Sequence, residues 1–227
     1  MDMIELKCRW CGREFTRERT LASHMCEKKR RWMAKDDPAS RIAFQVWLEF
    51  MRSVSPNAKK EKTQEDFIRS PDYIGFVKFA NHLIELRPVE SDRFIKWLFK
   101  MGVRLSDWCK PGTYTLYVQE NNKRETAERA VERTVLTMRE WSDESGLPWQ
   151  EFFQRVPAVT AMNMLVMGRI SPWVLYGSDA AQKMLDRMEP GQLGVIARSI
   201  DTEWWMKKIK KSPDELLWIN TLMKGIE

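Results

Sequence analysis

The sequence predicts a mainly α-helical protein in which a small cysteine-containing unit precedes a multi-helix body. Apolar residues make up 43% of the 227 residues, and their recurrence at helical spacing favours helices. Eleven tryptophans and fourteen methionines suit bulky cores, whereas only ten glycines and ten prolines argue against a many-turned β protein. We expect one domain over residues 1–35 and a helical domain over 36–227, with a further boundary near 146 as an open alternative.

The body is expected to be helical from residue 38 onward. Asp37 is a suitable N-cap, and Pro38 suits the first position of a helix. The polar tract 55–64 is predicted to be a loop. Residues 109–121 contain the strand-favouring Thr-Tyr-Thr-Leu-Tyr-Val, but they lie among helices and are therefore predicted to be helical. Apolar stripes predict further helices over 42–51, 73–84, 94–101 and 124–146, followed by shorter elements up to a last helix over 212–225.

Membrane-spanning and secreted classes are not expected. No apolar run approaches the ~18 residues that cross a bilayer. The first eight residues lack the charged-then-apolar layout of a signal peptide. We therefore expect a cytoplasmic, reducing location, where clustered cysteines more often bind metal or perform redox chemistry than form disulfides.

Three of the four cysteines and one of the two histidines lie between residues 8 and 26. Two residues separate Cys8 from Cys11, and twelve more precede His24. With Phe15 and Leu21 between them, these residues match the pattern C-x2-C-x3-F-x5-L-x2-H and closely resemble the Cys-Cys-His-His zinc finger. The resemblance implies a ββα-like unit with a helix over 17–25, a core of Phe15 and Leu21, and one structural Zn²⁺.

The fourth ligand departs from the family pattern. In the family it follows the histidine by three to five residues, whereas the candidate here, Cys26, lies two residues after His24. Two residues on an α-helix are about 200° apart and cannot both face one ion. Either the helix unwinds at Met25, or the ion has three protein ligands and one other; we favour unwinding. The predicted ligands are Cys8, Cys11, His24 and Cys26, a closed set without an open position for a catalytic water; the alternative is that these residues bind no metal.

The net charge of +6 is concentrated in the first 35 residues, which contain ten Lys/Arg and five acidic residues. A basic end indicates contact with a polyanion, most simply nucleic acid, although a solvated charged face is the alternative. The finger resemblance places the base-reading side chains at Arg17, Thr20 and Ser23, with Arg19 nearby. The basic tract, which we define as Lys28, Lys29, Arg30 and Arg31, is expected to contact phosphates.

The body offers no recognisable catalytic motif. Neither a P-loop nor a G-x-G-x-x-G pattern is present. His82 is expected in the core or at the surface, and Cys109 is expected to be a buried or idle thiol. Trp204 and Trp205 stand beside lysines, a mixture that suits either single-strand stacking or an amphipathic helix, and the second reading is simpler.

We therefore predict a non-enzymatic nucleic-acid-binding accessory or regulatory protein. We expect its finger and basic tract to contact DNA, with RNA as the alternative, and its helical body to contact a partner protein. The alternative is an interaction or assembly adaptor whose zinc finger is structural and binds protein; an enzyme without recognisable motifs ranks third. A single finger before a helical body also resembles uncharacterised small proteins of tailed bacteriophages, which implies the host cytoplasm and assigns no activity.

Overall fold

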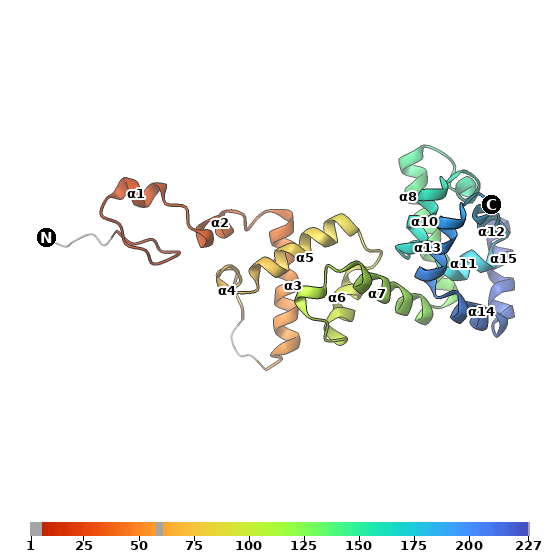
Figure 1. Ribbon diagram of the computed structural model, residues 1–227, viewed down its shortest axis with the longest axis horizontal. Helices are drawn as coiled ribbons and strands as arrows, with labels where there is room; N and C mark the ends of the chain where they lie inside the picture. Colours follow the sequence, from red (N-terminus) through yellow and green to blue (C-terminus); the bar gives the residue numbers. More distant parts are fainter. Residues whose placement is uncertain (1–5, 58–60, 227) are drawn as a thin grey trace. The chain divides into compact units, whose positions relative to one another are not determined.

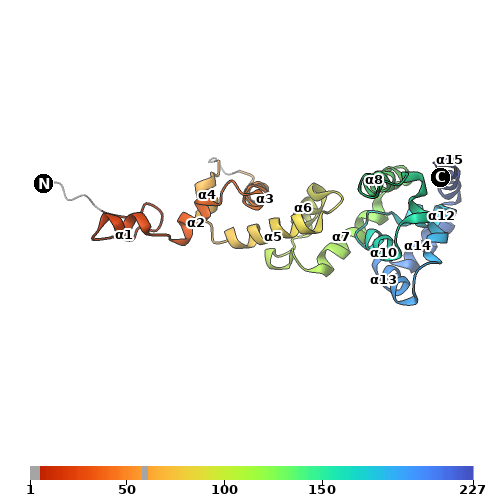
Figure 2. The same ribbon diagram turned by 90° about the horizontal axis from the view of Figure 1, so that it is seen from above.

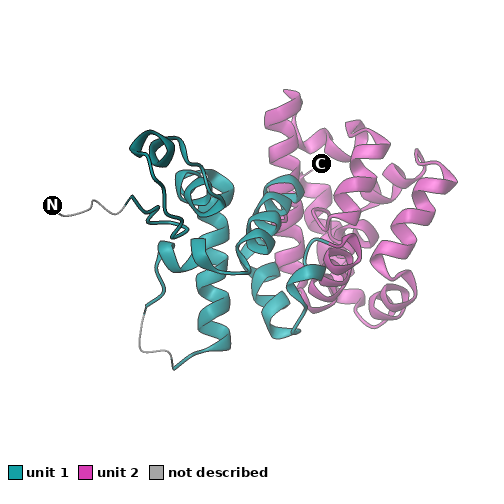
Figure 3. Cartoon of the chain, turned by 60° about the vertical axis from the view of Figure 1, so that its left-hand side comes forward, with its two compact units in different colours: residues 1–87, 91–109 teal, residues 88–90, 110–227 magenta. Residues whose placement is uncertain are grey.

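The computed structural model describes residues 6–57 and 61–226. These residues form fifteen α-helices and two short 3-10 helices, with no strand among them (Figure 1), so the mainly α prediction is confirmed. They group into two compact units: unit 1 comprises residues 1–87 and 91–109, and unit 2 comprises residues 88–90 and 110–227 (Figure 3). The units thus divide the chain near residue 109, a position that the sequence patterns did not indicate. In the described part of the chain, no helix combines the length and apolar character needed to cross a bilayer.

Unit 1 contains the N-terminal finger and a group of packed helices. Its elements are α1 (Glu18–Ser23), α2 (Glu27–Met33), α3 (Pro38–Val54), α4 (Gln64–Arg69), α5 (Tyr73–Leu86), α6 (Ser91–Lys100) and the 3-10 helix η1 (Leu105–Asp107). As predicted, Asp37 is the N-cap of α3 and Pro38 its first residue. The long helices α3 and α5 pack against each other.

Helix α4 begins at Gln64, the last residue of the predicted loop 55–64; residues 58–60 of this loop lie outside the described residues. Its first turn is closed by a reciprocal capping box. The backbone N–H of Thr63 donates to the Asp66 carboxylate over 2.9 Å, and the Asp66 N–H donates to the Thr63 hydroxyl over 3.3 Å. Capping holds this six-residue helix in place, so that Phe67 and Ile68 are completely buried.

The core of unit 1 is built around Trp108. Its indole is almost fully buried, and the rings of Phe50, Phe76 and Phe79 meet it edge-on at centroid distances of 6.0, 5.5 and 4.9 Å. Such edge-to-face pairs add to the free energy gained by burying apolar area. The indole N–H donates to the Val103 carbonyl over 2.9 Å, so the polar atom of this buried residue has a partner.

Arg31 ties helix α2 to the rest of unit 1. Its guanidinium donates to the carbonyls of Ile68 and Ser70 over 3.0 and 3.4 Å, at the end of α4. It also lies 4.5 Å from the ring centroid of Tyr73 and pairs with Glu27 one turn earlier in α2. Because a charged donor binds partly buried backbone carbonyls here, this contact is stronger than an ordinary surface ion pair.

Unit 2 is a second helical body. Its elements are α7 (Pro111–Arg124), α8 (Ala127–Ser145), the 3-10 helix η2 (Trp149–Glu151), α9 (Phe152–Arg155), α10 (Ala158–Val166), α11 (Pro172–Gly177), α12 (Asp179–Leu185), α13 (Pro190–Ile200), α14 (Thr202–Lys210) and α15 (Pro213–Ile226). Helix α7 confirms the helical prediction for residues 109–121, because Tyr114, Tyr117 and Val118 bury one face at helical spacing. Helix α10 packs beside α13 (Figure 2).

A buried ion pair lies inside unit 2. The Arg133 and Glu125 side chains are only 8% and 7% exposed and bind each other directly. Ser171 donates to the same carboxylate over 3.1 Å, and the Asn122 amide oxygen accepts from Arg133 over 3.1 Å. A buried charge is tolerated only when it is paired and hydrogen-bonded, so these side chains constrain how α7, α8 and α11 pack.

The Arg31 contact predicts a difference between two adjacent arginines. Replacing Arg31 by Ala leaves the carbonyls of Ile68 and Ser70 without this donor and should lower the free energy of unfolding by about 1–3 kcal/mol. Replacing the exposed Arg30 by Ala should change it by less than about 0.5 kcal/mol. Thermal unfolding of both variants, followed by circular dichroism, measures this difference; equal midpoints would show that Arg31 does not fasten α2.

Candidate metal centre

The loop that presents Cys8 and Cys11 is closed by its own backbone. The Gly12 N–H donates to the Cys8 carbonyl over 2.8 Å, and the Cys8 N–H donates to the Arg13 carbonyl over 2.8 Å. Gly12 has a φ of +76°, in the left-handed region that glycine adopts without steric cost. This tight turn places both cysteines on the same side of the chain.

The ββα expectation is wrong for the described part of the finger, which contains no strand. The segments on either side of the loop meet only in one isolated antiparallel bridge, between Lys7 and Glu14. Arg17 already serves as the N-cap of α1, so few residues remain after the loop to continue a strand pairing. The Lys7 amine and the Glu14 carboxylate, 3.4 Å apart, add an exposed ion pair to this bridge.

The expected helix over 17–25 is shorter in the structure, and its early end solves the ligand-spacing problem. Helix α1 ends at Ser23, and His24 follows it in an extended conformation, with φ −66° and ψ 123°. Cys26 is also extended and is the N-cap of α2. The chain therefore leaves the helical conformation just before His24, earlier than the unwinding expected at Met25, and both side chains can face one point.

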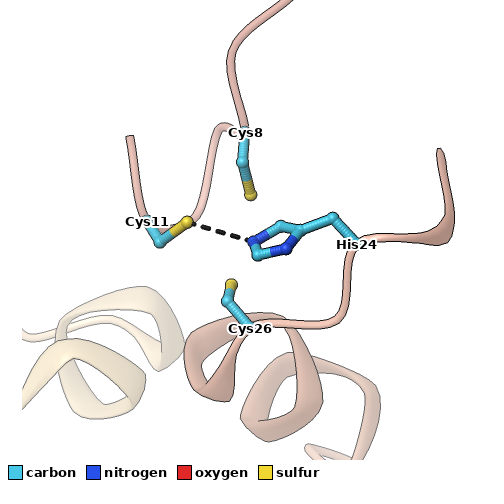
Figure 4. Close-up of side chains that lie close together, drawn as sticks. All are labelled: Cys8, Cys11, His24 and Cys26. Atoms are coloured by element: carbon cyan, nitrogen blue, oxygen red, sulfur yellow. Dashed lines mark hydrogen bonds between the residues drawn. The ribbon is translucent and has the colours of Figure 1, made fainter. Parts of the chain in front are cut away.

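Four side chains converge in the finger: Cys8, Cys11, His24 and Cys26 (Figure 4). Their ligand atoms all lie within 4.8 Å of one another, and Cys11 Sγ is 3.3 Å from His24 Nε2. Around a tetrahedral zinc ion, ligand atoms lie roughly 3.5–3.8 Å apart, given bond lengths of about 2.0–2.3 Å. The cluster therefore fits a single metal ion.

Two further features describe the surroundings of the cluster. The pKa of the Cys8 thiol is lowered, chiefly because the backbone N–H of Cys11 donates a hydrogen bond to it, whereas the pKa of the Cys11 thiol is raised by desolvation and by the neighbouring Cys8 and Cys26 side chains. The Phe15 ring lies 4.8 Å from the imidazole of His24, and Leu21 is half-buried, so both predicted core residues lie at the cluster.

The predicted nucleic-acid contacts separate into two groups. Arg17, Arg19, Thr20 and Ser23 are all exposed, on or next to α1. Within the basic tract, Lys28 and Arg30 are exposed, whereas Lys29 and Arg31 contact the protein. The Lys29 amine donates to the His24 carbonyl over 3.1 Å, at the C-terminal end of α1, where a cation is favoured. The tract is therefore not one continuous basic surface.

Sequence reasoning missed an aromatic pair beside the cluster. Trp10, inside the cysteine loop, lies 4.9 Å from Trp32 of α2, and the Arg9 guanidinium lies 4.5 Å from the Trp10 ring centroid. A cavity of about 400 Å³ opens next to this pair; its lining consists of Lys7, Cys8, Arg9, Trp10, Leu21, His24 and Lys29. The signal available in the sequence was a tryptophan between the paired cysteines Cys8 and Cys11, a place where core packing does not require one.

A second cavity, of about 580 Å³, lies along α5 and includes His82 and Cys109 in its lining. Burial lowers the pKa of His82 and raises that of the Cys109 thiol, so each group is shifted toward its uncharged form. Among the described residues, no hydrogen bond links the His82 and Cys109 side chains.

Comparison with known proteins adds no relative. No family model matches the chain, and neither the curated proteins nor the solved structures contain a match. The likeness to a zinc finger therefore depends on the ligand spacing and on the convergence of the four side chains.

The cluster predicts the metal content of the purified chain. We expect one equivalent of a divalent metal ion, and we expect Cys8→Ser or Cys26→Ser to lower it strongly, because each removes one of four ligands. Cys109→Ser is the matched control, since this cysteine is outside the cluster and should leave the metal content unchanged. Inductively coupled plasma mass spectrometry measures all three; full occupancy in Cys26→Ser would remove Cys26 from the ligand set.

Proposed function

We propose that the finger binds one structural Zn²⁺ and that the protein is a nucleic-acid-binding accessory or regulatory protein. Three thiolates and one imidazole form a Cys₃His set, which is typical of structural zinc sites. Thiolate ligands disfavour magnesium, calcium and manganese, which prefer oxygen. Four protein ligands complete a tetrahedron, so the ion supports folding of the finger and leaves no position for a catalytic water.

The observation that carries the nucleic-acid proposal is the set of exposed cations on the finger. Arg17, Arg19, Lys28 and Arg30 are exposed, and among the described residues none of them is in an ion pair. Of the nearby acids, Glu14 and Glu27 are paired with Lys7 and Arg31, and Glu18 is exposed in the first turn of α1. The four exposed cations outnumber this one exposed acid, and the resulting excess of positive charge favours a phosphate backbone.

The size of the finger favours a contributing rather than a solitary role. A single finger contacts only about 3 bp even when it reads DNA in the usual way. Affinity must then come largely from phosphate contacts, from the helical body, from a partner protein that the body binds, or from a second copy. This limit supports an accessory or regulatory function.

The adaptor alternative places a protein on the same finger surface. It predicts no salt-dependent affinity for nucleic acid, because counterion release accompanies only the neutralisation of phosphates. The binding experiment that follows therefore separates the two functions.

Replacing both Lys28 and Arg30 by Ala should weaken binding to every nucleic-acid sequence alike, since phosphate contacts carry no base information. The slope of log K against log salt should become shallower by about 1.4–1.8 when two phosphate contacts are lost. Fluorescence anisotropy over a salt titration measures both effects.

The matched control is Lys96→Ala with Lys100→Ala, which removes the same charge from two exposed positions one turn apart on α6. This control should keep the wild-type slope. If both double variants lose the same affinity, net charge rather than the finger surface governs binding; if wild type binds nothing at low salt, the adaptor replaces the nucleic-acid function.

A further inference from the structure

The aromatic pair of the finger has the chemistry of a base-stacking surface. Trp10 and Trp32 lie 4.9 Å apart with an interplanar angle of 36°, and each has a cation against its ring. The Arg9 guanidinium is 4.5 Å from the Trp10 centroid, and the Lys35 amine is 5.7 Å from the Trp32 centroid. Trp10 is half-buried, so part of its indole is accessible.

The adjoining cavity has the charge that a nucleotide needs. Arg9 lines it together with Trp10. Lys7, which pairs with Glu14, and Lys29, which donates to the His24 carbonyl, add positive charge to the lining, and Cys8, Leu21 and His24 complete it. A base stacked on an indole, with its phosphate among cations, is the arrangement by which proteins bind unpaired strands.

The helix α1 is poorly suited to the alternative, which is base reading in a duplex groove. It has six residues, a length of about 9 Å at 1.5 Å per residue. Arg17 is an extended N-cap rather than part of the helix, and the Ser23 hydroxyl already donates to the Thr20 carbonyl over 3.3 Å. A paired base inside a duplex also offers no free face to an indole.

We infer that Trp10 stacks on an unpaired base, so that the finger binds single-stranded nucleic acid, with the neighbouring Arg9 holding the adjoining phosphate. This inference rests on the proposed nucleic-acid function and narrows it to one substrate class. It also moves the contact from the exposed side of α1 to the cysteine loop. Single-stranded DNA and RNA share the recognised chemistry.

The test uses the full chain with its metal and three fluorescent probes: a single-stranded DNA of about 12 nucleotides, the same sequence as RNA, and its DNA duplex. We expect both single strands to bind more tightly than the duplex at equal salt. RNA bound more tightly than DNA would indicate a contact to the 2′-hydroxyl, and equal affinities would indicate contacts to base and phosphate alone. Both outcomes support the inference, and the first identifies RNA as the strand.

Trp10→Leu keeps an apolar side chain against Trp32 but removes the aromatic face. We expect it to weaken single-strand binding by roughly 5- to 150-fold, the range for loss of one stacked base, with duplex binding unchanged. Trp10→Phe should retain most of the affinity. Trp218→Leu, at a 41% exposed tryptophan on α15, is the matched control and should bind as wild type does.

A second measurement needs no substitution and holds even if Trp10→Leu loses its metal. Ultraviolet irradiation of the wild-type complex should crosslink a base to the peptide that contains Trp10, as mapped by mass spectrometry. Crosslinks confined to α1, tighter binding of the duplex, or wild-type affinity in a metal-loaded Trp10→Leu variant would each overturn the inference and leave the proposed function standing. Absence of binding to all three probes at low salt would overturn both.

Discussion

The short spacing of His24 and Cys26, with only Met25 between them, is the constraint on which the finger depends. Because a continuous helix would direct these side chains about 200° apart, the two residues cannot lie in one helix and still face one ion. The result is two short helices, α1 and α2, with one ligand just after the first and another just before the second. The same break directs α2 toward α4, where Arg31 binds the carbonyls of Ile68 and Ser70.

Positive charge in the finger has two distinct physical roles. Lys29 and Arg31 donate to backbone carbonyls, at the end of α1 and at the end of α4, and therefore stabilise the finger and its attachment. Lys28 and Arg30, their immediate neighbours, face solvent. Alternate residues of one short tract thus belong to different functions, and a count of charges in the sequence overstates how much of the tract can meet a polyanion.

The sequence predicted the features that depend on local chemistry. Pro38 after a capping aspartate located the start of α3, helical spacing made 109–121 a helix, and ligand spacing located the metal cluster. Features that depend on distant partners were missed. Arg31 contacts Ile68 and Ser70, which follow it by 37 and 39 positions, and Ser171 donates to Glu125, which precedes it by 46 positions. Helix α4 was also missed, although its capping box between Thr63 and Asp66 was a local signal.

Helix α2 also fixes the direction of the Arg31 side chain relative to that of Cys26. Its N-cap is Cys26, a member of the candidate metal cluster, and five residues after Cys26 it carries the anchor, Arg31. One inserted residue between them would rotate the anchor by about 100° relative to the ligand and lengthen the helix by about 1.5 Å. The ligand and the anchor could then no longer both reach their partners. The number of residues between Cys26 and Arg31 is therefore fixed by the rotation of the helix. A segment that stopped at Cys26 would lack helix α2 and its Arg31 contact, so it would not carry the whole folded unit.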